Sequence, residues 1–230
     1  MADGFSTPLH QPLLHESGLR HVTGEAKYVD DLPAPAGMLV AQVVGSTVAR
    51  GKLRGIDSSA ARAVKGVHAI ITAADIRGEN NVGTVVHDEE LLASAEVHFL
   101  GQAVALVVGE SYEACREGAA KLKVDVEPLP AIVTIEEGIA QNSWLSDPDR
   151  MLRGDPDDAL AKADVRFQGE VVTGGQDHFY LETHVTLAVP GEGATLHLFC
   201  STQHPSEVQA VVAHVLNWHR HQIVVEVPRM

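Results

Sequence analysis

The sequence predicts an α+β fold that is divided into two parts. Over roughly residues 20–130, short apolar runs of strand length alternate with helical segments. A second series of strand and helix patterns begins at Val165 and continues toward the C-terminus. Between the two, residues 140–164 contain two Asp-Pro pairs and many acidic residues, which are typical of a boundary segment. We therefore expect two folded units joined by a linker.

The first unit is expected to follow an irregular stretch, because residues 1–36 hold several prolines and no periodic apolar pattern. Apolar runs then predict strands at residues 38–46, 53–56, 67–73, 101–111 and 123–129. The run at 101–111 has a continuous apolar centre, so we place it in the middle of a sheet. Pro128 is expected to end the last of these strands, since proline cannot donate to a strand ladder.

The helices predicted in the first unit begin at residues that suit helix ends. They are expected at residues 57–64 and 111–122. Asp57 or Ser58 can accept a hydrogen bond from the first turn of the first helix, and Gly66 suits its end. Ser111 occupies the same capping position before the second helix.

The linker and the second unit carry signals of the same kind. Asp155 followed by Pro156 predicts the start of one short helix within the linker. Strands are predicted at residues 165–174, 182–190, 194–200 and 222–227, and a helix at 205–218. Pro205 suits the first position of that helix. The sequence stops three residues after the last predicted strand, so we expect this second unit to be unfinished.

Composition limits the possible functions. Apolar residues make up 45% and charged residues 21%, which is the balance of a globular protein with a hydrophobic core. The formal net charge of −14 argues against nucleic acid and anionic membranes as partners. The longest apolar runs are too short to span a bilayer, and the N-terminus resembles no secretion signal. We therefore expect a cytoplasmic protein.

The sequence contains two cysteines, Cys115 and Cys200, and no CxxC pair. This count disfavours a disulfide framework, a cysteine-rich zinc site and an iron–sulfur cluster held by this chain. We expect both cysteines to be small buried residues.

The segment at residues 171–184 has the densest mixture of polar and aromatic residues. Gly174 and Gly175 allow a turn and a close approach of the backbone to a ligand, and Gln176 follows with a neutral amide. His178 and His184 are too far apart for the HExxH type of zinc site. The residues alone leave two interpretations open, a Gly-Gly turn between two strands or one side of a binding site.

Two other polar clusters have simpler explanations. Residues 201–205, with the sequence STQHP, form either a capping cluster for the helix that follows or the rim of a ligand site. Residues 218–221, with the sequence WHRH, are expected to be exposed histidines that interact with the negative end of a helix.

Several stretches together resemble one protein family. These are GGQDHFYLETH at residues 174–184, STQHP, and QIVVEVPRM at 222–230, preceded by HVTGEAKYVDDLP at 21–33 and FLGQAVALVVGES at 99–111. In this order they resemble the molybdenum-binding subunit of the xanthine dehydrogenase and aldehyde oxidase family. The resemblance implies an N-terminal extension at 1–19, an α/β hammerhead domain at 20–130, a linker at 131–164, and the first part of a molybdopterin-binding domain at 165–230.

The resemblance also implies a chemistry. Family members hydroxylate purines such as hypoxanthine and xanthine with oxygen from water, and pass electrons through iron–sulfur clusters and FAD to NAD. Those carriers lie on other domains or subunits, so the family implies a hetero-oligomer. Gln176 matches the position whose amide binds an oxo group of the molybdenum, and Gly174 and Gly175 would bring the backbone close to the cofactor. No residue of this chain is implied as a catalytic group or as a direct metal ligand.

The sequence departs from the family at its end. In the family, the last strand runs into a glycine-rich segment, and a catalytic glutamate follows much later; the sequence stops at Met230, before both. We therefore expect the chain alone to be inactive. Two alternatives remain open: a related molybdenum hydroxylase that acts on aldehydes or N-heterocycles, and a binding or assembly module without chemistry of its own.

Overall fold

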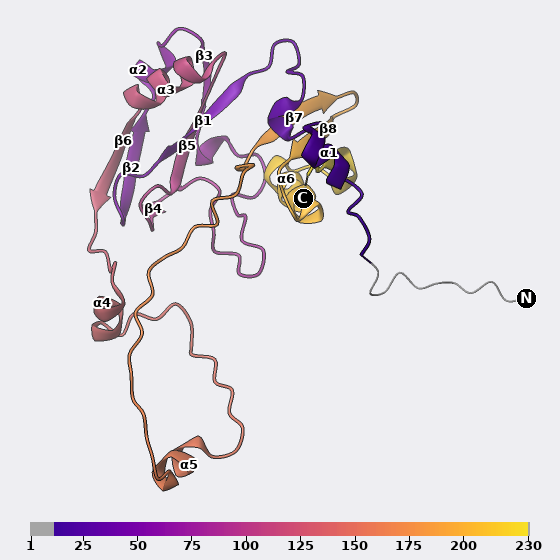
Figure 1. The fold of residues 1–230 in the computed structure, drawn as a ribbon. Helices are drawn as coiled ribbons and strands as arrows, with labels where there is room; N and C mark the ends of the chain where they lie inside the picture. The colour runs from indigo at the N-terminus through magenta and orange to yellow at the C-terminus, as the bar shows by residue number, and fades with distance from the viewer. Residues whose placement is uncertain (1–11, 230) are drawn as a thin grey trace, which may run out of the picture. The chain divides into compact units, whose positions relative to one another are not determined.

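The computed structural model describes residues 12–229, which form two compact units. Residues 12–129 and 181–229 form the first unit, and Pro130–Tyr180 forms the second (Figure 1). Residues 1–11, part of the stretch predicted to be irregular, lie outside the described residues. The remainder of that stretch contains two short helices, α1 (Gly18–Thr23) and the 3-10 helix η1 (Val29–Asp31), which the sequence pattern did not indicate.

Two antiparallel sheets of three strands account for the first predicted unit. One sheet has the order β1 (Val40–Gly45), β5 (Ala103–Gly109), β3 (Val67–Ile71). The other has the order β4 (Glu96–Val97), β2 (Gly51–Asp57), β6 (Lys123–Pro128). The five predicted strands are confirmed, including the central place of β5, whereas the two-residue strand β4 was not predicted.

Two helices pack on the β1-β5-β3 sheet, and their ends confirm most of the predicted capping. They are α2 (Ser59–Arg62) and α3 (Tyr112–Lys121), and a 3-10 turn, η2 (Ala73–Asp75), follows β3. Ser111 Oγ accepts a hydrogen bond from Ala114 N at 3.2 Å. Asp57 Oδ1 accepts one from Ser59 N at 3.0 Å, so Asp57 and not Ser58 supplies the acceptor before α2. The predicted end of this helix at Gly66 is wrong, because α2 ends at Arg62 and Ala63 follows it in a right-handed conformation. The left-handed conformation of Gly66, with φ +87°, instead directly precedes β3.

The third sheet is a β-α-β unit with one additional strand. Its order is β7 (Thr186–Gly191), β8 (Thr195–Cys200), β9 (Ile223–Glu226), with β7 antiparallel and β9 parallel to β8. The crossover from β8 to β9 contains α6 (Pro205–Leu216) and the 3-10 turn η3 (Arg220–Gln222). Leu198, Ala213 and Ile223 form the buried centre between this helix and the sheet. These elements confirm the strands and the helix predicted after residue 182.

The loop between η2 and β4 contacts the end of α6. Gly78 N donates to Val215 O at 3.0 Å, and Glu79 N donates to His214 O at 3.1 Å. A Cβ added to Gly78 would lie 1.8 Å from His214 O, so this close approach requires glycine. The loop itself is closed by Asn80, whose side chain bonds the backbone of Leu92 in both directions.

The Pro130–Tyr180 unit contains two short helices and long irregular segments (Figure 1). The predicted linker helix forms as α5 (Pro156–Lys162), and Asp155 Oδ1 accepts a hydrogen bond from Asp158 N at 2.9 Å. An unpredicted helix, α4 (Ile135–Ala140), begins at Thr134, whose Oγ1 accepts from Glu137 N at 3.2 Å. The spacing of Thr134 and Glu137 is that of a capping box, which could have indicated this helix.

The strand predicted at residues 165–174 is wrong. All of these residues are described, and none of them is in a strand or a helix. Phe167 is 95% exposed, and Val171 and Val172 are also exposed. A strand forms by backbone hydrogen bonding to a neighbouring strand. Among the described residues, no strand pairs with this segment.

Candidate functional site

The residues singled out by the glycine pair lie on exposed, irregular chain. Gly174, Gly175 and Gln176 are all exposed, and neither glycine has a positive φ. A Cβ added to either glycine would meet nothing within 4 Å. The expected Gly-Gly turn between two strands is therefore wrong, because the first strand is missing and the glycines adopt ordinary backbone conformations. What the two glycines offer is backbone that a ligand could approach.

A left-handed backbone conformation occurs further along, at Phe179. This residue has φ +48° and is 94% exposed, an unusual conformation for an aromatic residue. Asp177 Oδ1 accepts a hydrogen bond from Phe179 N at 3.3 Å. Asp177 thus supports the local backbone, which agrees with a structural role.

The chain becomes well anchored directly after Leu181. Glu182 Oε1 accepts a hydrogen bond from Val29 N at 2.8 Å, across 153 positions of sequence. Ser201 Oγ accepts from Val185 N and donates to Thr183 O, both at 2.9 Å. The segment from 171 to 184 therefore has an exposed first part and a fixed last part.

The STQHP cluster acts as a helix cap and also borders a small cavity. His204 Nδ1 accepts from Glu207 N at 3.3 Å, and Thr202 Oγ1 accepts from His204 N at 3.0 Å. The capping interpretation is therefore confirmed. A cavity of about 270 Å³ lies beside the cluster and is lined by His184, Val185, Thr186, Cys200, Ser201, Thr202 and Val208.

The histidines of the WHRH segment do not cap α6. Asn217 ends that helix in a left-handed conformation, and His219 and His221 lie beyond it, stacked at 5.5 Å. The last carbonyl groups of the helix accept instead from backbone N–H groups, including those of Gly78 and Glu79. Both histidines are exposed, as expected, and their interaction with the negative end of α6 stays a prediction.

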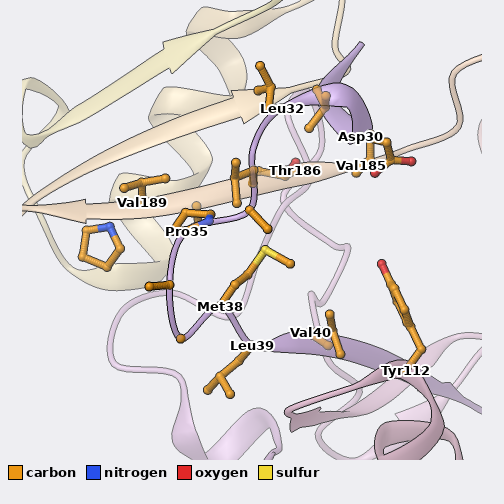
Figure 2. Close-up of a pocket in the computed structure, with 18 of the residues that line it drawn as sticks. Asp30, Leu32, Pro35, Met38, Leu39, Val40, Tyr112, Val185, Thr186 and Val189 are labelled. Carbon is orange, nitrogen blue, oxygen red and sulfur yellow. The ribbon is translucent and has the colours of Figure 1, made fainter. Parts of the chain in front are cut away.

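A larger cavity of about 700 Å³, which the sequence did not indicate, lies between residues 29–41 and the start of β7. Figure 2 shows Met38, Pro35 and Leu32 along the first segment, and Val185, Thr186 and Val189 along the second. Tyr112 of α3 borders the same space. The lining is mixed, because Asp30, Tyr112, His184 and Thr186 are polar members among the apolar side chains.

The titratable side chains and the cysteines bear on whether the described part of the chain could hold a metal ion itself. Among residues 12–229, no three His, Cys, Asp or Glu side chains are grouped so that they could hold a metal ion. Cys115 and Cys200 are both buried and free, as expected, and burial raises the pKa of the Cys115 thiol. In the described part of the chain, no helix is long and apolar enough to cross a membrane.

Comparisons with known proteins define the class to which this arrangement belongs. Residues 23–130 match the family described as aldehyde oxidase and xanthine dehydrogenase, a/b hammerhead domain. Residues 139–230 match the molybdopterin cofactor-binding domain. The chain belongs to the xanthine dehydrogenase and aldehyde oxidase family, and its mixed α/β fold is that of the hammerhead and molybdenum-binding regions.

Individual relatives differ in the substrates that their names state. A xanthine dehydrogenase of Drosophila pseudoobscura pseudoobscura is 43% identical over 97% of this chain and 17% of its own length. Aldehyde oxidase 4 of Cavia porcellus is 41% identical over 96% of this chain and 16% of its own length. The structure of quinoline 2-oxidoreductase from Pseudomonas putida 86 matches with a TM-score of 0.80 and 27% identity, covering 95% of this chain and 30% of that one. The chain thus spans about one sixth of the length of these curated relatives.

The residues present suit a molybdopterin group chemically but do not enclose it. Gln176 offers a neutral amide donor, and the backbone at Gly174 and Gly175 is unobstructed. Neither cavity described above is lined by these three residues. The chain could therefore contribute contacts to one side of such a group, and the rest of the enclosure would have to come from elsewhere.

Proposed function

We propose that this chain forms part of the molybdenum-binding portion of a xanthine dehydrogenase. The proposed reaction is the hydroxylation of hypoxanthine and xanthine to urate with oxygen from water, with electrons passing through iron–sulfur clusters and FAD to NAD. The observation that carries this proposal is the 43% identity to a xanthine dehydrogenase along 97% of the chain. When bound, the molybdenum group supplies the oxidising centre; this chain supplies contacts to it.

Within this function, we propose that Gln176 donates a hydrogen bond from its amide to an oxygen of the molybdenum group. Gly174 and Gly175 allow the backbone to approach the same group, which their unobstructed surroundings support. We assign no catalytic acid or base and no direct metal ligand to this chain. Because catalysis needs such groups positioned together, the 230-residue chain alone should not turn over substrate.

The proposed division of the chain is an extension at 1–19, a hammerhead domain at 20–130, a linker at 131–164, and the first part of a molybdopterin-binding domain at 165–230. The two family matches, at 23–130 and 139–230, support this order. Residues 20–130 contain both three-stranded sheets and their helices, so we expect them to fold alone. A polypeptide of these residues without a cooperative thermal transition would contradict the division.

The proposed partners are an iron–sulfur and FAD subunit or domain of the same enzyme, in a cytoplasmic hetero-oligomer. The net charge of −14 disfavours nucleic acid and anionic membrane surfaces as additional partners.

A second candidate function is that of a related hydroxylase acting on aldehydes or N-heterocycles. The 41% identity to an aldehyde oxidase is nearly as high as the identity to xanthine dehydrogenases, and it favours this alternative specifically. A third reading, a non-catalytic binding or assembly module, would apply if the chain occurs without the remainder of the enzyme.

The test is substrate turnover by the holoenzyme that contains this chain, normalised to its molybdenum content. Xanthine, an aromatic aldehyde and quinoline are compared at equal concentration. We expect kcat/KM for xanthine to exceed the other two by at least tenfold. A preference for the aldehyde or for quinoline would favour the second candidate. Stoichiometric molybdenum without turnover of any of the three would favour a non-catalytic role.

A further inference from the structure

Three hydrogen bonds join two parts of the chain that are far apart in sequence. Residues 12–129 and 181–229 belong to one compact unit, although the chain between them, Pro130–Tyr180, forms a unit of its own. Each of the three bonds has a backbone N–H of residues 12–129 as its donor and an acceptor in residues 181–229 as its partner. The two parts are therefore connected by direct contacts as well as by the intervening chain.

The first bond lies at the start of η1. Val29 is the first residue of this 3-10 helix, so its N–H has no acceptor within the helix. Glu182 Oε1 accepts this N–H at 2.8 Å, and a carboxylate makes a stronger bond to it than a neutral group would. Val29 is 3% exposed, so loss of the acceptor would leave a buried N–H unpaired, which is destabilising.

The other two bonds lie at the C-terminal end of α6, where the last carbonyl groups have no donor within the helix. Gly78 N donates to Val215 O at 3.0 Å, and Glu79 N donates to His214 O at 3.1 Å. N–H groups also suit the negative end of the helix dipole. Because a Cβ at position 78 would lie 1.8 Å from His214 O, a larger residue there would push the loop away from the helix.

Both groups of donors are held in place by bonds within residues 12–129. In η1, Asp31 Oδ2 accepts from Tyr28 N at 2.9 Å, and Asp31 N donates to Tyr28 O at 3.1 Å. In the loop, the side chain of Asn80 bonds the N–H and the carbonyl of Leu92, at 3.0 and 2.7 Å. A surface whose donors are fixed beforehand loses little conformational entropy when its partner binds. The partner is ordered as well, because α6 and the third sheet share a buried core of their own.

We propose that residues 12–129 carry a docking surface for residues 181–229, and that the two parts stay together without the covalent connection through Pro130–Tyr180. The surface recognises a helix C-terminus and a carboxylate through backbone N–H groups. The cavity of about 700 Å³ is lined by both parts, at residues 29–41 and 184–190, so docking also forms that space. Docking needs no cofactor, and its test is therefore independent of the proposed function.

The test cuts the folded 230-residue chain once within the Pro130–Tyr180 unit. A recognition sequence for a site-specific protease is inserted between Asp149 and Arg150, which are exposed and lie in neither a helix nor a strand. After cleavage, the pieces are analysed by size-exclusion chromatography and native mass spectrometry over a dilution series. We expect them to remain a one-to-one complex at micromolar concentration. Separation of the wild-type pieces under these conditions would overturn the proposal.

Substitutions at the two contacts show whether the docking surface holds the pieces together. Glu182→Ala removes the acceptor of Val29, and Gly78→Ala forces the loop away from α6, so each should weaken the association of the cut pieces about tenfold or more. Glu182→Gln keeps an acceptor oxygen at the same reach and should stay within about threefold of wild type. The matched controls are Glu192→Ala, which removes an exposed carboxylate, and Gly169→Ala, whose Cβ meets nothing within 4 Å. Neither control should change the association.

Folding of each variant is checked by amide exchange in β5 and β8 before cleavage. If Gly78→Ala does not fold, the comparison of Glu182→Ala with Glu182→Gln carries the test. Pieces that stay together equally well in Glu182→Ala and Gly78→Ala would show that contacts within Pro130–Tyr180 hold them, which would overturn the proposal. A loss of association in Glu192→Ala as large as that in Glu182→Ala would overturn it too.

Discussion

The segment at residues 165–174 and the strands β8 and β9 were all predicted to be strands, and they have opposite structural outcomes. Leu198 and Ile223 are 3% and 1% exposed, whereas Phe167 is 95% exposed. The strands are paired along their length and covered by α6, while the segment has no strand beside it among the described residues. Apolar spacing therefore specifies a strand only where a pairing partner and a covering layer are present.

Helices in the same two regions behave differently from strands. α5 forms in the Pro130–Tyr180 unit although none of its residues is buried, because its hydrogen bonds are internal and Asp155 caps it. Local signals therefore suffice for a capped helix. They do not suffice for a strand, whose hydrogen bonds are made to another segment.

The largest contrast is expected from truncating one apolar side chain in each region. Ile223→Ala removes a buried side chain from the centre between α6 and the third sheet, and should lower the free energy of unfolding by about 2–5 kcal/mol. Phe167→Ala removes an exposed ring and should change it by less than about 0.5 kcal/mol. Chemical denaturation of both variants measures the difference. Comparable losses would show that the segment is packed after all.

The second test concerns the loop that contacts α6. Gly78→Ala places a Cβ 1.8 Å from His214 O, a backbone atom that cannot move without displacing the helix end. We expect a loss of about 1–3 kcal/mol in the free energy of unfolding, as for other overpacked sites. Gly169→Ala is the matched control in the irregular segment, because an added Cβ there meets nothing within 4 Å. An unchanged Tm for Gly78→Ala would rule out the close approach.

The third test removes one capping side chain from α3 and one from α5. Ser111→Ala should lower the free energy of unfolding by about 1 kcal/mol. Because α3 packs on a sheet, weakening this helix destabilises the whole unit. Asp155→Ala should cost α5 a similar amount, but the effect should appear as local loss of helix and not as a lower Tm. Amide chemical shifts and thermal unfolding separate the two responses. A lower Tm in Asp155→Ala would indicate that α5 is packed against the rest.

The smallest effect is expected from surface charge. Arg54 lowers the pKa of Glu127 by hydrogen bonding, with Nε 2.7 Å from Oε2, and by its charge. A lowered carboxyl pKa contributes stability above the pKa of the unfolded chain, and this contribution is lost as the pH falls through the folded value. Both side chains are half exposed, so the contribution is small.

The measurement is the Tm of Arg54→Gln against that of the wild type as the pH is lowered. The variant should be slightly less stable near pH 7, and the gap should close below about pH 4. Lys162→Gln, which breaks the exposed pair with Asp158 on α5, is the matched control and should leave the Tm unchanged. A gap that widens in acid would contradict the assigned sign.

Much of the fold follows from local sequence signals, and the failures have physical causes. The central strand β5, the caps Ser111 and Asp155, and Pro205 at the start of α6 were all predictable from neighbouring residues. β4 was missed because two paired residues leave too short a pattern. The strand at 165–174 was predicted wrongly because its sequence contains no information on whether a partner strand is present.

The candidate site shows the same limit. The sequence identified Gln176 and its glycines by their chemistry and by resemblance. It could not identify the bond from Glu182 to Val29, because that contact joins positions 153 residues apart and one partner is a backbone N–H common to every non-proline residue. The cavity between residues 29–41 and β7 was missed for the same reason.

The role of Gln176 is tested most directly by steady-state turnover of the holoenzyme, normalised to molybdenum content, for two variants. In the proposed role, Gln176→Ala would remove a donor from an oxygen whose charge changes during the reaction, and such a loss typically lowers the rate on the order of 10²–10³. We expect the lower part of that range or less, since water can replace the amide. Gln176→Glu should be slower still, because a carboxylate repels the oxygen. Wild-type rates in both variants would contradict the proposed role of Gln176 and leave it as an ordinary residue of an exposed segment.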